Sequence, residues 1–261
     1  MNDTLTANKA IISGSGETTL IFLHYFGGSA ESWQWVTNTL SGQYRCVAIN
    51  LPGFGGTAMQ DQPSIAGFAA YVQLQLQNLG IKRYVLIGHS MGGKIAMQVA
   101  VNERKNNIIQ QLILLAPSPP STERKPESEK QRMLNHPSAE EATTTVKTAI
   151  VQTLNNDQYA LAINTQYIAD NDVWRWWIQE GMNQSIADEV KTLTLPITVI
   201  ASKDDPAVTY KMTSDDTMPN LPAHAKLITT DGIGHLYPLE APGWLAELLK
   251  IIIIEQSSYQ H

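Results

Sequence analysis

The sequence predicts an α/β fold with a mostly parallel sheet, helices on its faces and a helical insertion. Short apolar runs of strand length alternate with segments of helical pattern, as in βαβ units. The alternation stops at about residue 118, where no convincing strand follows, and resumes after residue 193. We therefore divide the chain into an N-terminal core part (1–117), a helical insertion (118–193) and a C-terminal core part (194–261).

The N-terminal core part has the clearest alternation of strand and helix patterns. Ser64 is a suitable N-cap for a helix that runs to Leu79, and Gly80 is a suitable residue to end it. The expected strands are 20–23, 46–50, 84–87 and 111–115, and the expected helices are 30–40, 64–79 and 91–102.

The insertion begins with a charged run, 121–130, which we expect to be a solvated surface. Helical segments with a tryptophan cluster follow it. In the C-terminal core part, strands are expected at 197–201 and 226–229, and a last helix at 242–255.

Composition excludes several classes of function. The 261 residues are 43% hydrophobic and 16% charged, which favours a folded chain over a disordered one. Net charge is −6 and no Lys/Arg cluster occurs, so we expect no nucleic-acid partner. The apolar run 248–254 is shorter than the ~20 residues that span a bilayer, so we expect no membrane partner.

Cysteine usage and the N-terminus predict a cytoplasmic protein. Cys46 is the single cysteine and lies in an expected strand, so a buried structural thiol is more plausible than a reactive one. The first residues, 1–4, have neither a basic nor an apolar signal region.

The segment Gly88-His89-Ser90-Met91-Gly92 fits the pattern G-x-S-x-G. A buried strand leads into it and a helix leaves it, so Ser90 should lie on a sharp strand-to-helix turn. This geometry exposes the hydroxyl and directs the free N–H groups of the helix toward it. Ser90 is therefore the predicted nucleophile.

The same residues allow a second interpretation as a phosphate-binding loop. Gly88 to Lys94 fits G-x-x-x-x-G-K, but that loop needs Ser or Thr next, and Ile95 stands there. We therefore disfavour an NTPase and expect Lys94 to be an exposed residue in the first turns of the helix.

A serine nucleophile needs a base, and the base needs an acid that orients it. Among six histidines, His235 follows the last strand and precedes the last helix, at the carboxyl end of the sheet where α/β proteins place ligands. His224 precedes that strand, at the opposite end. Asp204 and Asp205 follow the strand 197–201, which matches the chain order Ser, Asp, His.

The developing oxyanion would need two backbone N–H donors. Met91 is one candidate, and Phe26 in the loop His24–Gly28 is the other. We expect His24 to brace this loop rather than act as a second base. We expect neither a metal ion nor an organic cofactor.

Four segments together resemble the α/β-hydrolase superfamily over nearly the whole chain except the insertion. They are His24–Gly28, Asn50–Gly55, Gly88–Gly93 and Gly234-His235. The resemblance implies that the insertion is a helical cap over the active site. Tyr25 departs from the His-Gly usual in the first segment, and Asn50 stands where Asp is common.

The family's acid loop often has the pattern Gly-x-x-Asp-Pro. Ser202 takes the glycine's place in this chain, so the resemblance assigns the acid to Asp205, with Asp204 as the alternative. Haloalkane dehalogenases and epoxide hydrolases have aspartate at the nucleophile position, and Ser90 argues against both.

The expected function is hydrolysis of a small carboxylic ester or lactone through an acyl-enzyme, as in carboxylesterases and lactonases. Carbon–carbon bond hydrolysis and cofactor-free perhydrolysis use the same residues and stay open, as do a non-catalytic ligand-binding role and the oligomeric state. Candidate substrate-binding residues are Tyr25, Trp174, Trp176 and Trp177. Neighbouring helix positions diverge by about 100°, so the tryptophans cannot all face one way. They pack the insertion onto the core, or at least one lines an acyl pocket.

Overall fold

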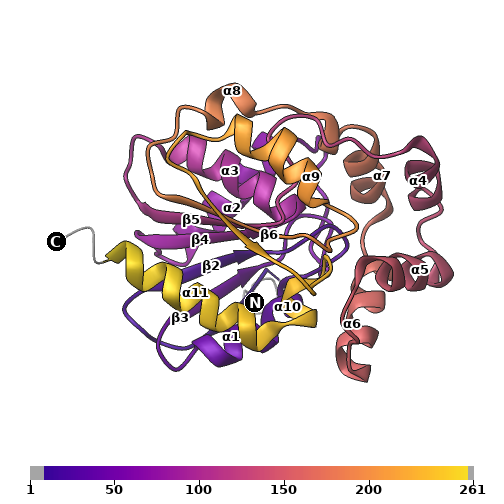
Figure 1. The fold of residues 1–261 in the computed structure, drawn as a ribbon, viewed down its shortest axis with the longest axis horizontal. Coiled ribbons are helices and arrows are strands. Elements are labelled where there is room, and N and C mark those ends of the chain that lie inside the picture. The colour runs from indigo at the N-terminus through magenta and orange to yellow at the C-terminus, as the bar shows by residue number, and fades with distance from the viewer. Residues whose placement is uncertain (1–8, 258–261) are drawn as a thin grey trace.

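A seven-stranded sheet crosses the centre of the computed structural model, which describes residues 9–257 (Figure 1). The strand order is β1-β3-β2-β4-β5-β6-β7; β1 is antiparallel to β3 and the other neighbours are parallel. The predicted mostly parallel sheet is confirmed. The strands are β1 (Ala10–Ser13), β2 (Thr19–Leu23), β3 (Arg45–Ile49), β4 (Tyr84–His89), β5 (Ile109–Leu115), β6 (Ile197–Ser202) and β7 (Lys226–Thr230).

Helices cover both faces of the sheet (Figure 1). Leu20 and Phe22 of β2 point to the face that carries α1 and α11, whereas Ile21 and Leu23 point to the face that carries α2 and α3. Strands buried on both faces are continuous apolar runs, which explains the composition of β2. These helices are α1 (Gln34–Leu40) with the preceding 3-10 turn η1 (Ala30–Trp33), α2 (Ile65–Asn78), α3 (Met91–Glu103) and α11 (Pro242–Ser257).

The ends of α2 follow the sequence prediction. The Ser64 hydroxyl accepts the Gly67 N–H at 2.9 Å, which caps the first turn. Gly80 has a φ of +66°, a conformation that favours glycine, so the helix ends there.

Helices fill the insertion between β5 and β6, and no strand occurs within residues 118–193. Helices α4 to α7 project beyond the sheet on the right of Figure 1, whereas α8 packs on α3. The elements are α4 (Glu127–Met133), α5 (Ala139–Ala149), α6 (Asn156–Tyr167), α7 (Asn171–Gln179), η2 (Gly181–Asn183) and α8 (Ala187–Val190).

The structure contains short elements that the sequence did not reveal. Strand β1 lies at the edge of the sheet with Ile11 and Ile12 exposed, so no burial pattern marked it. The others are α9 (Tyr210–Met212), the π-helical turn η3 (Thr213–Thr217), η4 (Met218–Asn220) and α10 (Tyr237–Glu240).

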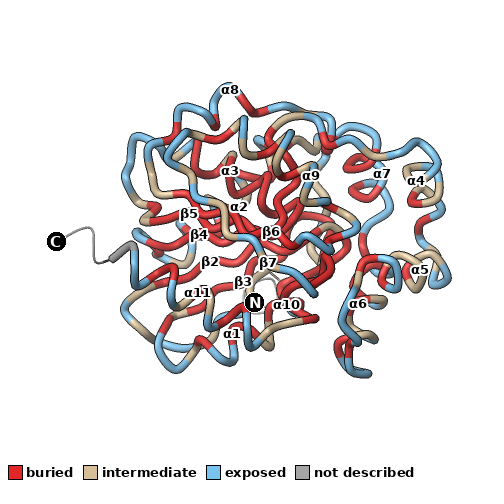
Figure 2. Tube along the Cα trace, viewed as in Figure 1, coloured by how far each residue is buried: buried red, intermediate tan, exposed pale blue. Residues whose placement is uncertain are grey.

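Burial is deepest in the central strands β2 to β6, which are red in Figure 2, whereas the edge strands β1 and β7 are partly exposed. Cys46 lies there on β3, and burial raises the pKa of its thiol to about 12, as expected for a structural cysteine. Within residues 9–257, no helix has both the length and the apolar character needed to cross a membrane.

Residues 1–4, in which the sequence predicts no signal region, lie outside the described part of the chain. The cytoplasmic location therefore stays a prediction.

Candidate active site

Ser90 lies on the turn between β4 and α3, as the sequence predicts. Its φ of +54° is strained for a non-glycine residue, and such strain persists where the surrounding structure enforces it. Main-chain bonds contribute to this: Ser90 N–H donates to Leu115 O at 2.9 Å, and Ser90 O accepts the N–H groups of Gly93 at 2.9 Å and Ser118 at 3.0 Å. A Cβ on Gly92 would lie 2.5 Å from His24 O, so only glycine lets α3 begin this close to the 24–28 loop.

His235 lies between Ser90 and Asp205. Its Nε2 is 2.9 Å from Ser90 Oγ, and its Nδ1 is 2.8 Å from Asp205 Oδ2. All three residues are buried, so water competes little for these contacts. The structure therefore brings together Ser90, His235 and the one of the two candidate carboxylates that the family resemblance favours.

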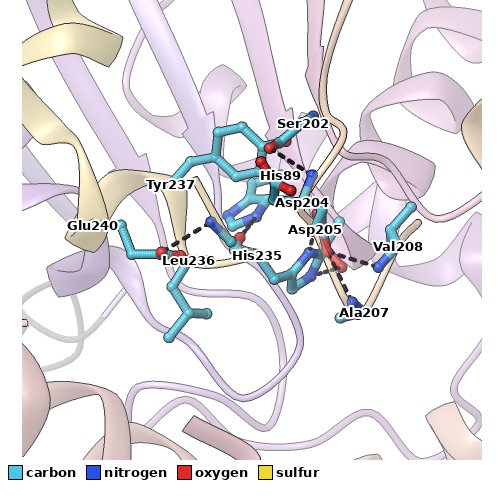
Figure 3. Close-up of polar contacts among 12 residues, drawn as sticks. His89, Ser202, Asp204, Asp205, Ala207, Val208, His235, Leu236, Tyr237 and Glu240 are labelled. Carbon is cyan, nitrogen blue, oxygen red and sulfur yellow. Dashed lines mark hydrogen bonds and ion pairs between the residues drawn. The ribbon is translucent and has the colours of Figure 1, made fainter. Parts of the chain in front are cut away.

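The two adjacent carboxylates have different surroundings. Asp205 is 3% exposed, and its Oδ1 accepts N–H groups from Ala207 at 2.9 Å and Val208 at 3.0 Å, leaving Oδ2 for His235 (Figure 3). Asp204 is exposed and accepts the Gly232 N–H at 2.7 Å. The geometry therefore favours Asp205 as the partner of the histidine.

The loop after β2 approaches the start of α3. Gly28 N–H donates to Tyr25 O at 2.9 Å and closes a turn around Phe26 and Gly27. Met91 is the first residue of α3, so its N–H has no acceptor within the helix. The two predicted oxyanion donors therefore belong to two backbone segments that lie close together, the loop after β2 and the start of α3.

His24 braces this loop, as predicted. Its Nδ1 is 2.8 Å from Tyr25 O, and its Nε2 accepts the Leu51 N–H at 3.1 Å. Burial lowers the pKa of His24 to about 4, which keeps the imidazole neutral and able to accept that N–H.

A cavity of about 350 Å³ opens onto Ser90 and His235. Of the four candidate substrate-binding residues, Tyr25 and Trp177 line it. Trp174 instead stacks on His136, and Trp176 stacks on Phe68 of α2. The divergence of neighbouring helix positions explains this split. The lining residues are Tyr25, Phe26, Ser90, Glu123, Lys125, Glu129, Arg132, Met133, Thr145, Thr148, Ala149, Gln166, Trp177, Pro206, Ala207, Val208, His235 and Leu236.

One wall of the cavity carries charges that are already paired. Lys125 Nζ lies 3.4 Å from Glu123 and 3.5 Å from Glu129, and it donates to Ala207 O at 3.2 Å. Burial alone would lower the pKa of Lys125, but the two carboxylates outweigh it and raise that pKa. Arg132 pairs with Glu141 at 2.8 Å. This wall is therefore polar, but each of these charged groups is paired with a group of opposite charge.

Lys94 is buried, and the prediction that it is exposed was wrong. Its Nζ donates to Ser121 O at 2.9 Å and Met182 O at 3.2 Å, so the ammonium joins two separate parts of the insertion to α3. Burial lowers its pKa to about 8, against the opposing effect of Glu123. These carbonyl partners are far away in sequence, so no local pattern revealed them.

Sequence reasoning also missed residues that hold the backbone near His235. His89 Nε2 lies 2.8 Å from His235 O, and Glu240 accepts N–H groups on both sides of that histidine (Figure 3). His89 was visible only as the variable position of G-x-S-x-G. Within residues 9–257, no group of three or more His, Cys, Asp or Glu side chains is placed to hold a metal ion.

Comparisons with known proteins concern the family and the fold of the chain. A sequence model of the alpha/beta hydrolase family matches residues 20–248. The dihydrolipoyllysine-residue acetyltransferase component of the acetoin cleaving system of Cupriavidus necator is 37% identical over 94 residues, 34% of this chain and 24% of that protein. In this relative and in two further curated relatives, the aligned part covers between 24% and 40% of the relative's own length.

Solved structures match over nearly the full length. An esterase from Exiguobacterium antarcticum superposes with a TM-score of 0.84 at 17% identity, over 94% of both chains. Est816, an N-acyl homoserine lactone degrading enzyme, superposes with a TM-score of 0.78 at 22% identity, over 92% of this chain and 95% of that one. At these identities the likeness shows the fold.

Proposed function

Because the chain belongs to the alpha/beta hydrolase family, we propose that it is a serine hydrolase of small carboxylic esters or lactones. The observation that carries the proposal is the contact chain Ser90–His235–Asp205, with distances of 2.9 Å and 2.8 Å between buried side chains. A neutral imidazole held this way can take the proton of the serine hydroxyl.

In the first half-reaction, Ser90 Oγ attacks the ester carbonyl carbon while its proton moves to His235 Nε2. Asp205 holds the Nδ1–H and stabilises the imidazolium. The Phe26 and Met91 N–H groups stabilise the oxyanion, each by about 3 kcal/mol in the transition state. His235 then protonates the leaving alcohol as its bond to the acyl carbon breaks.

In the second half-reaction, water gives a proton to His235 Nε2 and attacks the acyl-enzyme. The acid leaves and the proton returns to Ser90 Oγ. A lactone follows the same steps, but its leaving alcohol stays attached to the acyl group, so the product is a hydroxy acid.

We propose that the insertion acts as a cap that selects small substrates. Lining residues from α4, α5, α6 and α7 close one side of the cavity over Ser90. A volume of about 350 Å³ is near the lower end of the ~300–1,000 Å³ usual for ligand pockets. Tyr25, Phe26 and Trp177 offer apolar surface to an acyl chain.

The test is an assay with p-nitrophenyl esters of increasing acyl length and several lactones. Wild-type protein, Ser90→Ala and the control Ser41→Ala, at the end of α1, would be compared. We expect turnover in the wild type and the control, preference for short acyl chains, and loss of turnover in Ser90→Ala. No turnover in any protein would reject simple esters and lactones and favour carbon–carbon hydrolysis, perhydrolysis or a binding role.

A further inference from the structure

Glu240, at the end of α10, is a buried carboxylate that accepts four backbone N–H groups. Its Oε2 accepts those of Val151 at 2.8 Å, Gln152 at 2.9 Å and Gly234 at 2.9 Å, and its Oε1 accepts that of Leu236 at 2.9 Å. Hydrogen bonds to an ionised acceptor are about twice as strong as neutral ones. One side chain therefore holds two backbone segments that are about 80 residues apart.

The first of these segments is the loop 234–236, which contains His235. Glu240 accepts the N–H groups of Gly234 and Leu236, the two residues that flank His235. The His235 N–H donates to Ala149 O at 2.6 Å, and the His235 carbonyl lies 2.8 Å from His89 Nε2 (Figure 3). The backbone around the imidazole is therefore held by Glu240, which is near it in sequence, and by Ala149 and His89 from other parts of the chain.

The second segment is the junction between α5 and α6, residues 149–152, which belongs to the insertion. Apolar contacts add to the polar ones here, because Val146 and Leu154 pack in one cluster with Leu236 and Leu239. A Cβ on Gly234 would lie 2.5 Å from Ala149 O and 2.7 Å from Val151 N. The junction and the histidine loop are therefore in direct contact.

We propose that Glu240 is a positioning residue that keeps the His235 imidazole in line with Ser90 and ties the α5–α6 junction to the same loop. This proposal rests on the proposed function for its kinetic part. A 1 Å displacement of a reacting group costs on the order of 10²-fold in rate. A carboxylate that holds the N–H groups on both sides of His235 limits such a displacement. A displacement of the α5–α6 junction would then also displace the base.

The experiment compares Glu240→Gln and Glu240→Asp with the control Glu247→Gln. Glutamine has one acceptor oxygen, so it cannot serve both sets of N–H donors, and aspartate keeps the charge but is one methylene shorter. Glu247 lies on α11, is exposed and pairs with Lys250, so its replacement leaves the loop intact.

For Glu240→Gln we expect a kcat lower by about 10- to 100-fold with little change in KM, and a smaller loss for Glu240→Asp. Amide hydrogen exchange should accelerate together at Val151, Gln152, Gly234 and Leu236. The control should keep wild-type kcat and exchange rates.

A lower Tm in Glu240→Gln with unchanged kcat and unchanged exchange at Gly234 and Leu236 would overturn the proposal, since Glu240 would then be merely structural. If the wild type hydrolyses none of the esters or lactones, the proposed function fails and hydrogen exchange still decides. Joint loss of protection at both segments supports the coupling, and loss confined to Val151 and Gln152 contradicts it.

Discussion

Replacement of Asp205 by asparagine should change which nitrogen of His235 carries the proton. Asp205 Oδ1 accepts the Ala207 and Val208 N–H groups, so the asparagine carbonyl oxygen must stay at that position. Its NH₂ group then faces His235 Nδ1, where Oδ2 lies at 2.8 Å in the wild type. Two donors cannot share this contact, so the imidazole takes the tautomer with its proton on Nε2.

That tautomer cannot accept the Ser90 proton, because the nitrogen 2.9 Å from Ser90 Oγ is already protonated. A wrong tautomer of this kind lowers kcat by about 10⁴-fold in a serine protease, or about 5 kcal/mol in activation free energy. We expect a loss of this size in Asp205→Asn, measured as initial rates at saturating ester. Thermal unfolding followed by circular dichroism would show that the variant is folded.

Asp204→Asn is the matched control, because Asp204 is adjacent, exposed and bonded to Gly232 N–H rather than to the histidine. Its kcat should stay within about 3-fold of wild type, as for surface substitutions away from the chemistry. A kcat in Asp205→Asn above a tenth of wild type, or an equal loss in Asp204→Asn, would refute the assignment of the acid.

Three further predictions concern stability and specificity. The His24 pKa is lowered from 6.5 to about 4, so its contribution to the free energy of unfolding is complete above pH 6.5 and is lost as pH falls to about 4. Urea unfolding should show that this group's contribution to the free energy of unfolding, about 3 kcal/mol, is lost over that pH range. The free energy of unfolding should depend less on pH in His24→Asn, and an equal dependence in both proteins would contradict the prediction. Gly92→Ala should destabilise the protein by about 3 kcal/mol, because its Cβ would lie 2.5 Å and 2.6 Å from main-chain oxygens. The control Gly42→Ala should leave Tm nearly unchanged, because nothing lies within 4 Å of its Cβ. Similar Tm values in the two variants would refute this prediction. Trp177→Ala should accept longer acyl chains than the wild type in ester assays, whereas Trp176→Ala should only lower Tm. If Trp177→Ala had the same acyl preference as the wild type, Trp177 would not line the acyl pocket.

The sequence predicted the elements that local patterns define. The buried strands β2 to β6 are apolar runs, and the Ser90 turn is bounded by a strand and a helix, so both were visible along the chain. The candidate base followed from topology, since His235 comes after the last strand, where the carboxyl ends of the parallel strands meet. His224 lies at the opposite end, as predicted, with its Nε2 2.9 Å from Leu195 O, before β6 begins.

Features that depend on distant partners could not be predicted in this way. A lysine near a helix N-terminus is usually solvated, and Lys94 is buried because carbonyls of Ser121 and Met182 meet its ammonium. No local pattern marks Glu240, because its partners Val151 and Gln152 lie 89 and 88 residues away in the sequence. Strand β1 is short and exposed at the sheet edge, so it has no periodic pattern.

The most direct test of the account is covalent labelling with a fluorophosphonate, which reacts with an activated serine hydroxyl without requiring the natural substrate. Peptide mass spectrometry would locate the modification in the wild type, His235→Ala and Ser90→Ala. We predict labelling at Ser90 in the wild type, strongly slowed labelling in His235→Ala and none in Ser90→Ala. An unlabelled wild type, or labelling that persists in Ser90→Ala, would contradict the claim that His235 and Asp205 activate Ser90 as a nucleophile.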